Sequence, residues 1–213
     1  MDGIEEALGA FPVRSMVGEF CDRTGMMADI IGLGAGETLV AEGMARICVQ
    51  YHQDCPRAEL KCKDYGFQGM EGRSGKPVVK QCEIGLVTGI APIFAKGRHV
   101  ANLFAGPALL APVDEDVLCA GAAKRGMDET VYSGLYHRIP RVGHDDFIEA
   151  LERIAAAVNL KAEGGFDSTA DAMAHEHLEK AEAAFIIPAH DADVPARSAA
   201  KAHGAKIGPQ VEM

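Results

Sequence analysis

Four cysteines lie close together in the sequence and could act as one chemical centre. Cys48, Cys55, Cys62 and Cys82 are separated by six, six and nineteen residues. Four thiolates can complete a tetrahedral zinc site or hold an iron–sulfur cluster, because soft sulfur ligands favour those metals over magnesium and calcium. The spacing lacks the CxxC pairs of zinc ribbons and fingers. Metal binding, plain packing and a reversible disulfide therefore stay open, with His52 as a further candidate ligand.

The other residues that could do chemistry form no recognisable site. Cys21 lies on the apolar stripe of a predicted helix and Cys119 inside a later one, where a free cysteine behaves as a small hydrophobe. His175 and His177 are two apart in a predicted helix and so do not share a face. No nucleophile motif or HExxH signature accompanies the histidines. We therefore assign no catalytic residue and expect binding rather than catalysis.

Composition and charge narrow the classes of protein. The chain has 213 residues, of which 48% are hydrophobic, which is enough for one domain with a core. The acidic start and the lack of a long apolar run predict a cytoplasmic protein with reduced thiols and no membrane span. The net charge is −10 and the basic residues are scattered, so we expect no direct binding of nucleic acid.

Periodicity predicts helices and strands in a mixed order. The β pattern is clearest at Pro77–Lys80, Gly85–Phe94 and Val100–Leu110, after weaker signals at Met26–Leu33 and Glu37–Glu42. Residues 44–75 sustain neither period and are expected to form short helices and loops. Helices are predicted at 13–24, 114–125, 128–137, 144–160 and 168–184.

These elements predict an α/β (α+β) domain with a central antiparallel sheet of about five strands, covered on one face by helices. We expect residues 1–160 to form the domain, and residues 161–213 to be an alanine-rich helical extension and a disordered tail. An apolar ligand pocket is predicted between the sheet and residues 44–75. The expected ligand-binding residues are Ile90, Ile93, Phe94, Leu103 and Phe104.

Several short sequence motifs of this chain are shared with a known family. The first are Cys48 and Cys62, followed by Gly75-Lys76-Pro77 and Cys82-Glu83-Ile84-Gly85-Leu86. In these features, across roughly residues 10 to 160, the chain resembles the PocR sensory domain, whose fold is related to PAS and GAF domains. Further shared features are Ala91-Pro92-Ile93, the turn at Gly97, Leu103-Phe104-Ala105-Gly106, Ala123-Lys124-Arg125-Gly126-Met127-Asp128 and Ile139-Pro140-Arg141-Val142.

The resemblance implies a sensor of small organic molecules, proposed for the family to be hydrocarbon derivatives such as short diols. The family's cysteines correspond to Cys48, Cys62 and Cys82, and Cys55 is an addition that would bring the set to four. The family commonly has a histidine directly after the third cysteine, whereas this chain has Glu83. Domains of this family are usually attached to a transcription regulator or a histidine kinase. This sequence shows neither a basic helix-turn-helix segment nor kinase motifs, so we expect a stand-alone sensor whose output is carried by a separate regulator or kinase partner.

We therefore expect a cytosolic small-molecule or redox sensory domain whose cysteines bind zinc or an iron–sulfur cluster. Ligand or the redox state of the thiols would order residues 44–75 and change a helical surface presented to the partner. One rival is a redox or corrinoid-linked accessory component that transfers electrons through an iron–sulfur cluster. Another is a structural zinc domain. The sequence leaves the ligand and the oligomeric state, including a homodimer, open.

Overall fold

The fold was established from a computed structural model. The residues that it describes are 8, 11–33, 38–41, 44–58, 62, 75–95, 97–164 and 168–185.

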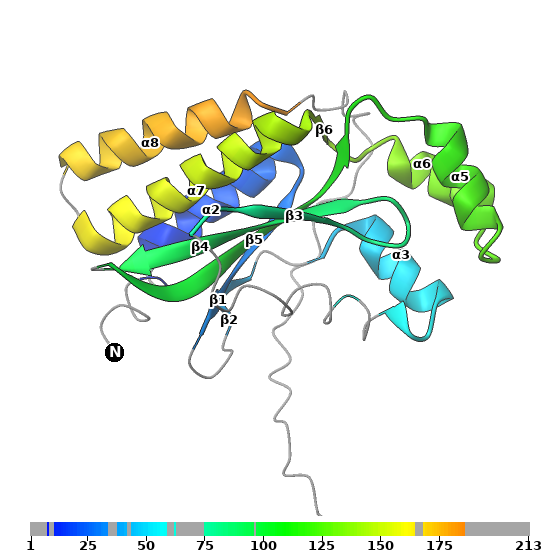
Figure 1. Ribbon diagram of the computed structural model, residues 1–213, viewed down its shortest axis with the longest axis horizontal. Coiled ribbons are helices and arrows are strands. Elements are labelled where there is room, and N and C mark those ends of the chain that lie inside the picture. Colours follow the sequence, from blue (N-terminus) through cyan, green and yellow to red (C-terminus); the bar gives the residue numbers. More distant parts are fainter. Residues whose placement is uncertain are drawn as a thin grey trace, which may run out of the picture.

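A single sheet forms the middle layer of the molecule, with the strand order β2-β1-β5-β4-β3 (Figure 1). These five strands pair antiparallel, and the short strand β6 adds to β5 in parallel. The predicted α+β class with a central antiparallel sheet is therefore confirmed, and β6 is an addition that the sequence did not predict. The bounds are β1 Met27–Gly32, β2 Thr38–Ala41, β3 Val78–Gln81, β4 Val87–Ala95, β5 Arg98–Leu110 and β6 Arg141–Val142.

Three helices, α2 (Phe11–Thr24), α7 (His144–Gly164) and α8 (Ser168–Glu182), cover one face of the sheet (Figure 1). The apolar stripe predicted for α7 is confirmed, because all four of its side chains are fully buried in the main core. The helix approaches the sheet closely at Gly89, where a Cβ would lie 2.3 Å from Leu151 Cδ1. The four side chains are Phe147, Leu151, Ile154 and Val158.

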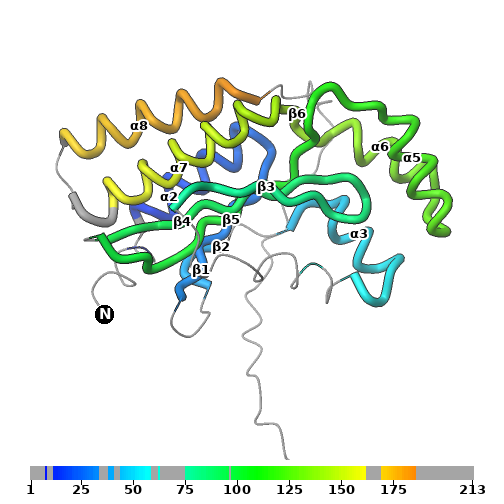
Figure 2. Tube along the Cα trace, in the orientation of Figure 1, coloured from blue at the N-terminus to red at the C-terminus, as the bar shows by residue number. Residues whose placement is uncertain are grey.

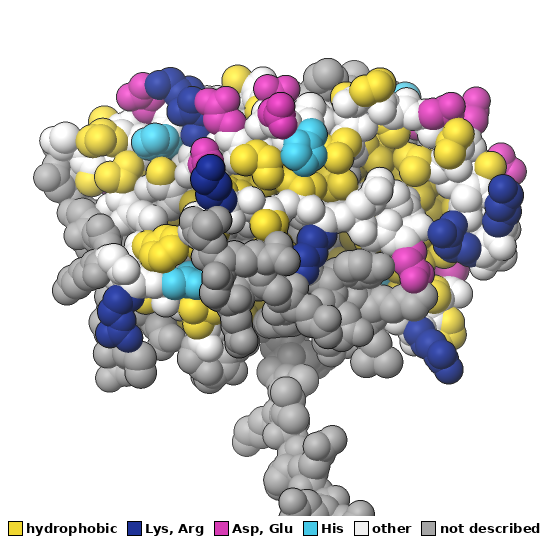
Figure 3. Space-filling view, viewed as in Figure 1, with side chains coloured by type: hydrophobic (Ala, Val, Ile, Leu, Met, Phe, Trp, Pro, Cys, Tyr) yellow, Lys and Arg dark blue, Asp and Glu magenta, His cyan; other side chains and the backbone are white. Residues whose placement is uncertain are grey.

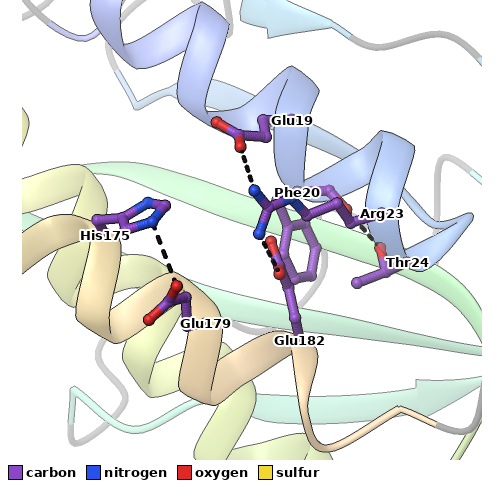
Figure 4. A network of polar contacts seen from close by, with 7 residues as sticks. All are labelled: Glu19, Phe20, Arg23, Thr24, His175, Glu179 and Glu182. Carbon is purple, nitrogen blue, oxygen red and sulfur yellow. Dashed lines mark hydrogen bonds and ion pairs between the residues drawn. The ribbon is translucent and has the colours of Figure 1, made fainter.

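Helix α8 belongs to this layer, although it lies beyond the boundary that we expected at residue 160. Phe185, three residues after the helix ends, makes edge contacts with Phe20 at 6.2 Å and with Phe147 at 5.8 Å between ring centroids. On the surface, Arg23 of α2 donates to Glu182 of α8 at 3.1 Å and to Glu19 at 2.6 Å (Figure 4). Helix α8 and the residues after it are therefore joined to α2 by an aromatic cluster inside and by one ion pair outside.

The other three helices gather at one end of the sheet, beside the turn between β3 and β4 (Figures 1 and 2). They are α3 (Arg46–Asp54), α5 (Glu115–Ala123) and α6 (Glu129–Tyr136). Asp114 and Asp128 cap the last two, each accepting a hydrogen bond from the backbone N–H three residues on. These helices enclose a second apolar cluster, separate from the main core, that includes Ile47, Ile84, Leu86 and Met127.

The charged surface in view shows Lys and Arg side chains dispersed among acidic ones rather than gathered in one patch (Figure 3). Among the described residues, no helix is long and apolar enough to cross a membrane.

Candidate thiol centre and sheet face

Three of the four cysteines lie in or beyond α3 and the fourth lies in the β3–β4 turn, and all four pack against the second apolar cluster. Cys48 lies in α3, Cys55 follows the end of that helix, Cys62 lies beyond it, and Cys82 stands in the turn between β3 and β4. All four are partly buried, pack against the same cluster and form no disulfide. The two remaining thiols, Cys21 and Cys119, are buried, as their predicted packing role requires.

The thiols influence one another electrostatically. The pKa of Cys48 is raised to about 12, chiefly by burial and in addition by the neighbouring Cys82 and Cys62, which oppose a second negative charge. Burial also raises the pKa of Cys62, with added contributions from Cys82, Glu83 and Cys55. Cys48, Cys62 and Cys82 therefore lie close enough to influence one another, and burial together with mutual repulsion opposes ionisation of Cys48 and Cys62.

Cys82 occupies a turn that is suited to holding a thiolate. Gly85 adopts a left-handed φ of +82° and donates its N–H to the Cys82 carbonyl at 3.0 Å, while the Cys82 N–H reaches Leu86 O at 2.8 Å. Burial raises the pKa of Cys82, and the backbone N–H groups of Ile84 and Leu86 act in the opposite direction by hydrogen bonding to its sulfur. This turn supplies fixed donors to one sulfur before any ligand arrives.

His52 lies against one of the thiols, with 3.3 Å between its Nε2 and Cys62 Sγ. His52 is the residue that the sequence analysis named as a further candidate ligand, and it contacts one of the four thiols. Within the described residues, however, no three His, Cys, Asp or Glu side chains converge as closely as a preformed metal site requires. A bound metal would have to draw the sulfur atoms closer together.

Three tyrosine hydroxyls surround the thiols, and the sequence analysis did not identify them. Tyr51 donates to Glu83 Oε2 at 3.0 Å, Tyr132 to Asp54 Oδ2 at 3.1 Å, and Tyr136 to the carbonyl of Ile84 at 2.6 Å. Tyr132 and Tyr136 are four apart on α6 and therefore share a face, which is the signal that could have paired them. Their acceptors lie far away in sequence and carry no such signal.

The five residues expected to bind a ligand divide between the two faces of the sheet. Ile93 and Leu103 are fully buried in the main core beneath the helices. Alternate residues of a strand point to opposite faces, so Ile90 and Phe104, each flanked by residues that face the helices, point the other way. They are direct partners across β4 and β5. Phe94, whose ring lies 5.4 Å from that of His99, follows the core residue Ile93.

This second face also carries polar side chains among the apolar ones. Asn102 is only 9% exposed and is bonded through its Oδ1 to His99 Nε2 at 2.8 Å. In the next row, Asp29 of β1 stands opposite Phe104. A largely apolar surface with a few placed polar groups is the usual composition of a small-molecule site.

The family assignment follows from the sequence model described as "Sensory domain found in PocR", which matches residues 12–166. The chain belongs to the PocR sensory domain family. Membership supports a ligand-sensing function and agrees with the antiparallel sheet and its helical layer. Searches of curated proteins and of solved structures each returned no match. Helix α8, which packs in the main core of this PocR-family domain, begins just beyond the matched residues.

Proposed function

We propose that this PocR-family domain senses a small organic molecule bound on the sheet face opposite the helices. We further propose that Cys48, Cys55, Cys62 and Cys82 hold zinc or an iron–sulfur cluster that responds with it. The signal would pass to a separate regulator or kinase. The observation that carries the proposal is that Cys82, in the β3–β4 turn, and the three thiols in and beyond α3 all pack against one apolar cluster.

The chemistry of this donor set fits a soft metal. Thiolate sulfur is the ligand that zinc and iron–sulfur clusters prefer, and a bound cation would balance the negative charge that burial and the neighbouring thiols disfavour at Cys48. The turn at Cys82 already directs backbone N–H groups at a sulfur atom. Metal binding would supply a folded-state cross-link between α3 and the β3–β4 turn.

The β3–β4 hairpin provides the physical connection between the thiols and the sheet face. Cys82 lies in its turn, Leu86 packs in the second cluster, and Ile90 lies farther along β4 on the face away from the helices. A shift of the turn therefore moves a strand that contributes to the proposed ligand surface. Ligand and metal could in this way favour the same state of the domain.

The first test concerns the thiol centre. Protein purified without oxygen should contain zinc, or iron and sulfide with a broad absorption near roughly 400 nm. The variants Cys48→Ser and Cys82→Ser should each lose the metal, whereas Cys21→Ala, which removes a thiol from the main core, should retain it. Metal-free wild-type protein that also fails to take up zinc, cobalt or reconstituted cluster would refute this part of the proposal.

The second test concerns the sheet face. Small molecules released by denaturing the purified protein would be identified by mass spectrometry and their affinity measured by calorimetry. Phe104→Leu, which shortens a side chain on the proposed face, should weaken binding. The matched change Leu110→Val, at the end of the same strand beside the main core, should leave it unchanged. Equal affinities in all three proteins would place the ligand elsewhere.

A further inference from the structure

The three tyrosines around the thiol centre share an unusual placement. Each hydroxyl donates to an acceptor one or two residues from a cysteine: Asp54 precedes Cys55, and Glu83 and Ile84 follow Cys82. The tyrosines themselves are almost completely buried, with Tyr51 3% exposed and Tyr132 and Tyr136 not exposed at all.

We propose that Tyr51, Tyr132 and Tyr136 are positioning residues, whose hydroxyls fix the backbone that presents Cys55 and Cys82 to a common metal. This inference rests on the proposed function, because it assigns these residues a role toward the same thiols. The outer hydrogen bonds of a metal centre orient its ligands and contribute to its affinity. None of the three tyrosines is assigned as a metal ligand.

Helix α6 supplies two of the contacts, and they reach both thiol-bearing segments. Tyr132 holds Asp54 at the end of α3, and Tyr136, one turn later, holds the Cys82 turn through the carbonyl of Ile84. The two rings lie 6.2 Å apart between centroids, so one rigid surface sets the separation of the two segments. A second donor, Gln50 Nε2, binds the other oxygen of Asp54 at 3.0 Å and fixes that carboxylate further.

Tyr51 completes the arrangement from the opposite side. It lies in α3, one turn after Cys48 and four residues before Cys55, and its hydroxyl reaches across to Glu83 beside Cys82. The bond therefore links the two segments directly. It also holds in one place a carboxylate whose charge lies beside the thiols, where the family commonly has a histidine.

The test uses three variants, Tyr51→Phe, Tyr132→Phe and Tyr136→Phe, which remove one hydroxyl each and keep the buried ring. The control is Thr24→Val, which removes a buried hydroxyl bonded to Phe20 O at 2.7 Å in the main core. Two quantities are measured in the full chain. One is the rate at which cobalt(II) or zinc passes from the loaded protein to a coloured chelator. The other is the alkylation rate of each cysteine in metal-free protein, followed by mass spectrometry.

Each tyrosine variant should release metal about tenfold faster than wild type, as is typical when an outer hydrogen bond of a metal centre is removed. In metal-free protein, Tyr132→Phe should accelerate alkylation of Cys55, and Tyr136→Phe that of Cys82, by roughly tenfold through local opening. Tyr51→Phe should affect both cysteines. Thr24→Val should lower thermal stability without changing either measurement.

The two measurements separate this inference from the proposed function. Wild-type protein that binds no metal refutes the metal centre, and the alkylation rates then decide whether the tyrosines position the thiols. If the tyrosine variants lose thermal stability like Thr24→Val, yet keep wild-type metal release and cysteine alkylation, the hydroxyls only stabilise the fold and the inference is wrong.

Discussion

The role of α8 can be tested through Phe185, the residue at its end that lies between two rings of the core. The side chain is 7% exposed and contacts Phe20 and Phe147 edge-on. Replacing a buried phenylalanine by alanine costs about 3 to 5 kcal/mol, and we use the lower end because Phe185 lies just beyond the last turn of α8 rather than inside an element. At about 2 to 4 °C per kcal/mol for a chain of this size, Phe185→Ala should lower Tm by about 6 to 12 °C.

Circular dichroism during heating and urea titration measures this effect, with Met173→Ala as the control. Met173 lies on the same helix but is 47% exposed, so its loss should change stability by no more than about 0.5 kcal/mol. If Phe185→Ala unfolds at the temperature of the control, α8 does not contribute to the cooperative unit. The domain would then end near residue 160, as the composition suggested.

Three further predictions concern packing, surface charge and pH. Gly89→Ala should destabilise the protein by about 1 to 3 kcal/mol in urea titrations, because the new methyl group would overlap Leu151. Arg23→Ala should leave the midpoint of urea denaturation nearly unchanged in the same assay, because the ion pair with Glu182 lies at the surface. The pKa of Cys48 is raised in the folded state to about 12, so this thiol contributes stability below its ordinary pKa of 9.0 and loses it as the pH rises toward 12. Metal-free wild type should therefore lose about 2 kcal/mol more than Cys48→Ala between pH 8 and pH 10.5; equal losses would contradict the stated environment.

The elements were predictable because their signals are local. Asp114 and Asp128 precede the helices that they cap, and the turn at Gly97 separates β4 from β5 as expected. The two-residue strand β6 had no such signal, because its pairing with Leu109 and Leu110 depends on the path of the whole chain.

The proposed site was only partly predictable. The four cysteines are grouped in the sequence, and this indicated that they would lie near one another. The positions of the neighbouring tyrosines could not be predicted, because they depend on contacts such as that of Tyr132 with Asp54, which is 78 residues away. The division of Ile90 from Ile93 between the two faces could have been predicted from the period of two along a strand. The packing of α8 against the core could not have been predicted. Its buried face includes small residues such as Ala174 and Ala181, which contribute little to an apolar pattern.

The position of Cys82 gives this domain a direct route from thiol chemistry to the sheet. Val87, the first residue of β4, is fully buried in the main core, while Leu86, one residue earlier, packs in the second cluster with the cysteines. Close-packed clusters resist gradual deformation, so a change at the turn must be absorbed by the neighbouring strand or by the helices that enclose the thiols. The turn is closely enclosed by α5, since a Cβ at Gly85 would lie 2.3 Å from Leu118 of that helix. We therefore expect a change at the thiols to be transmitted first to α5 and α6 and to the strand β4 that bears Ile90.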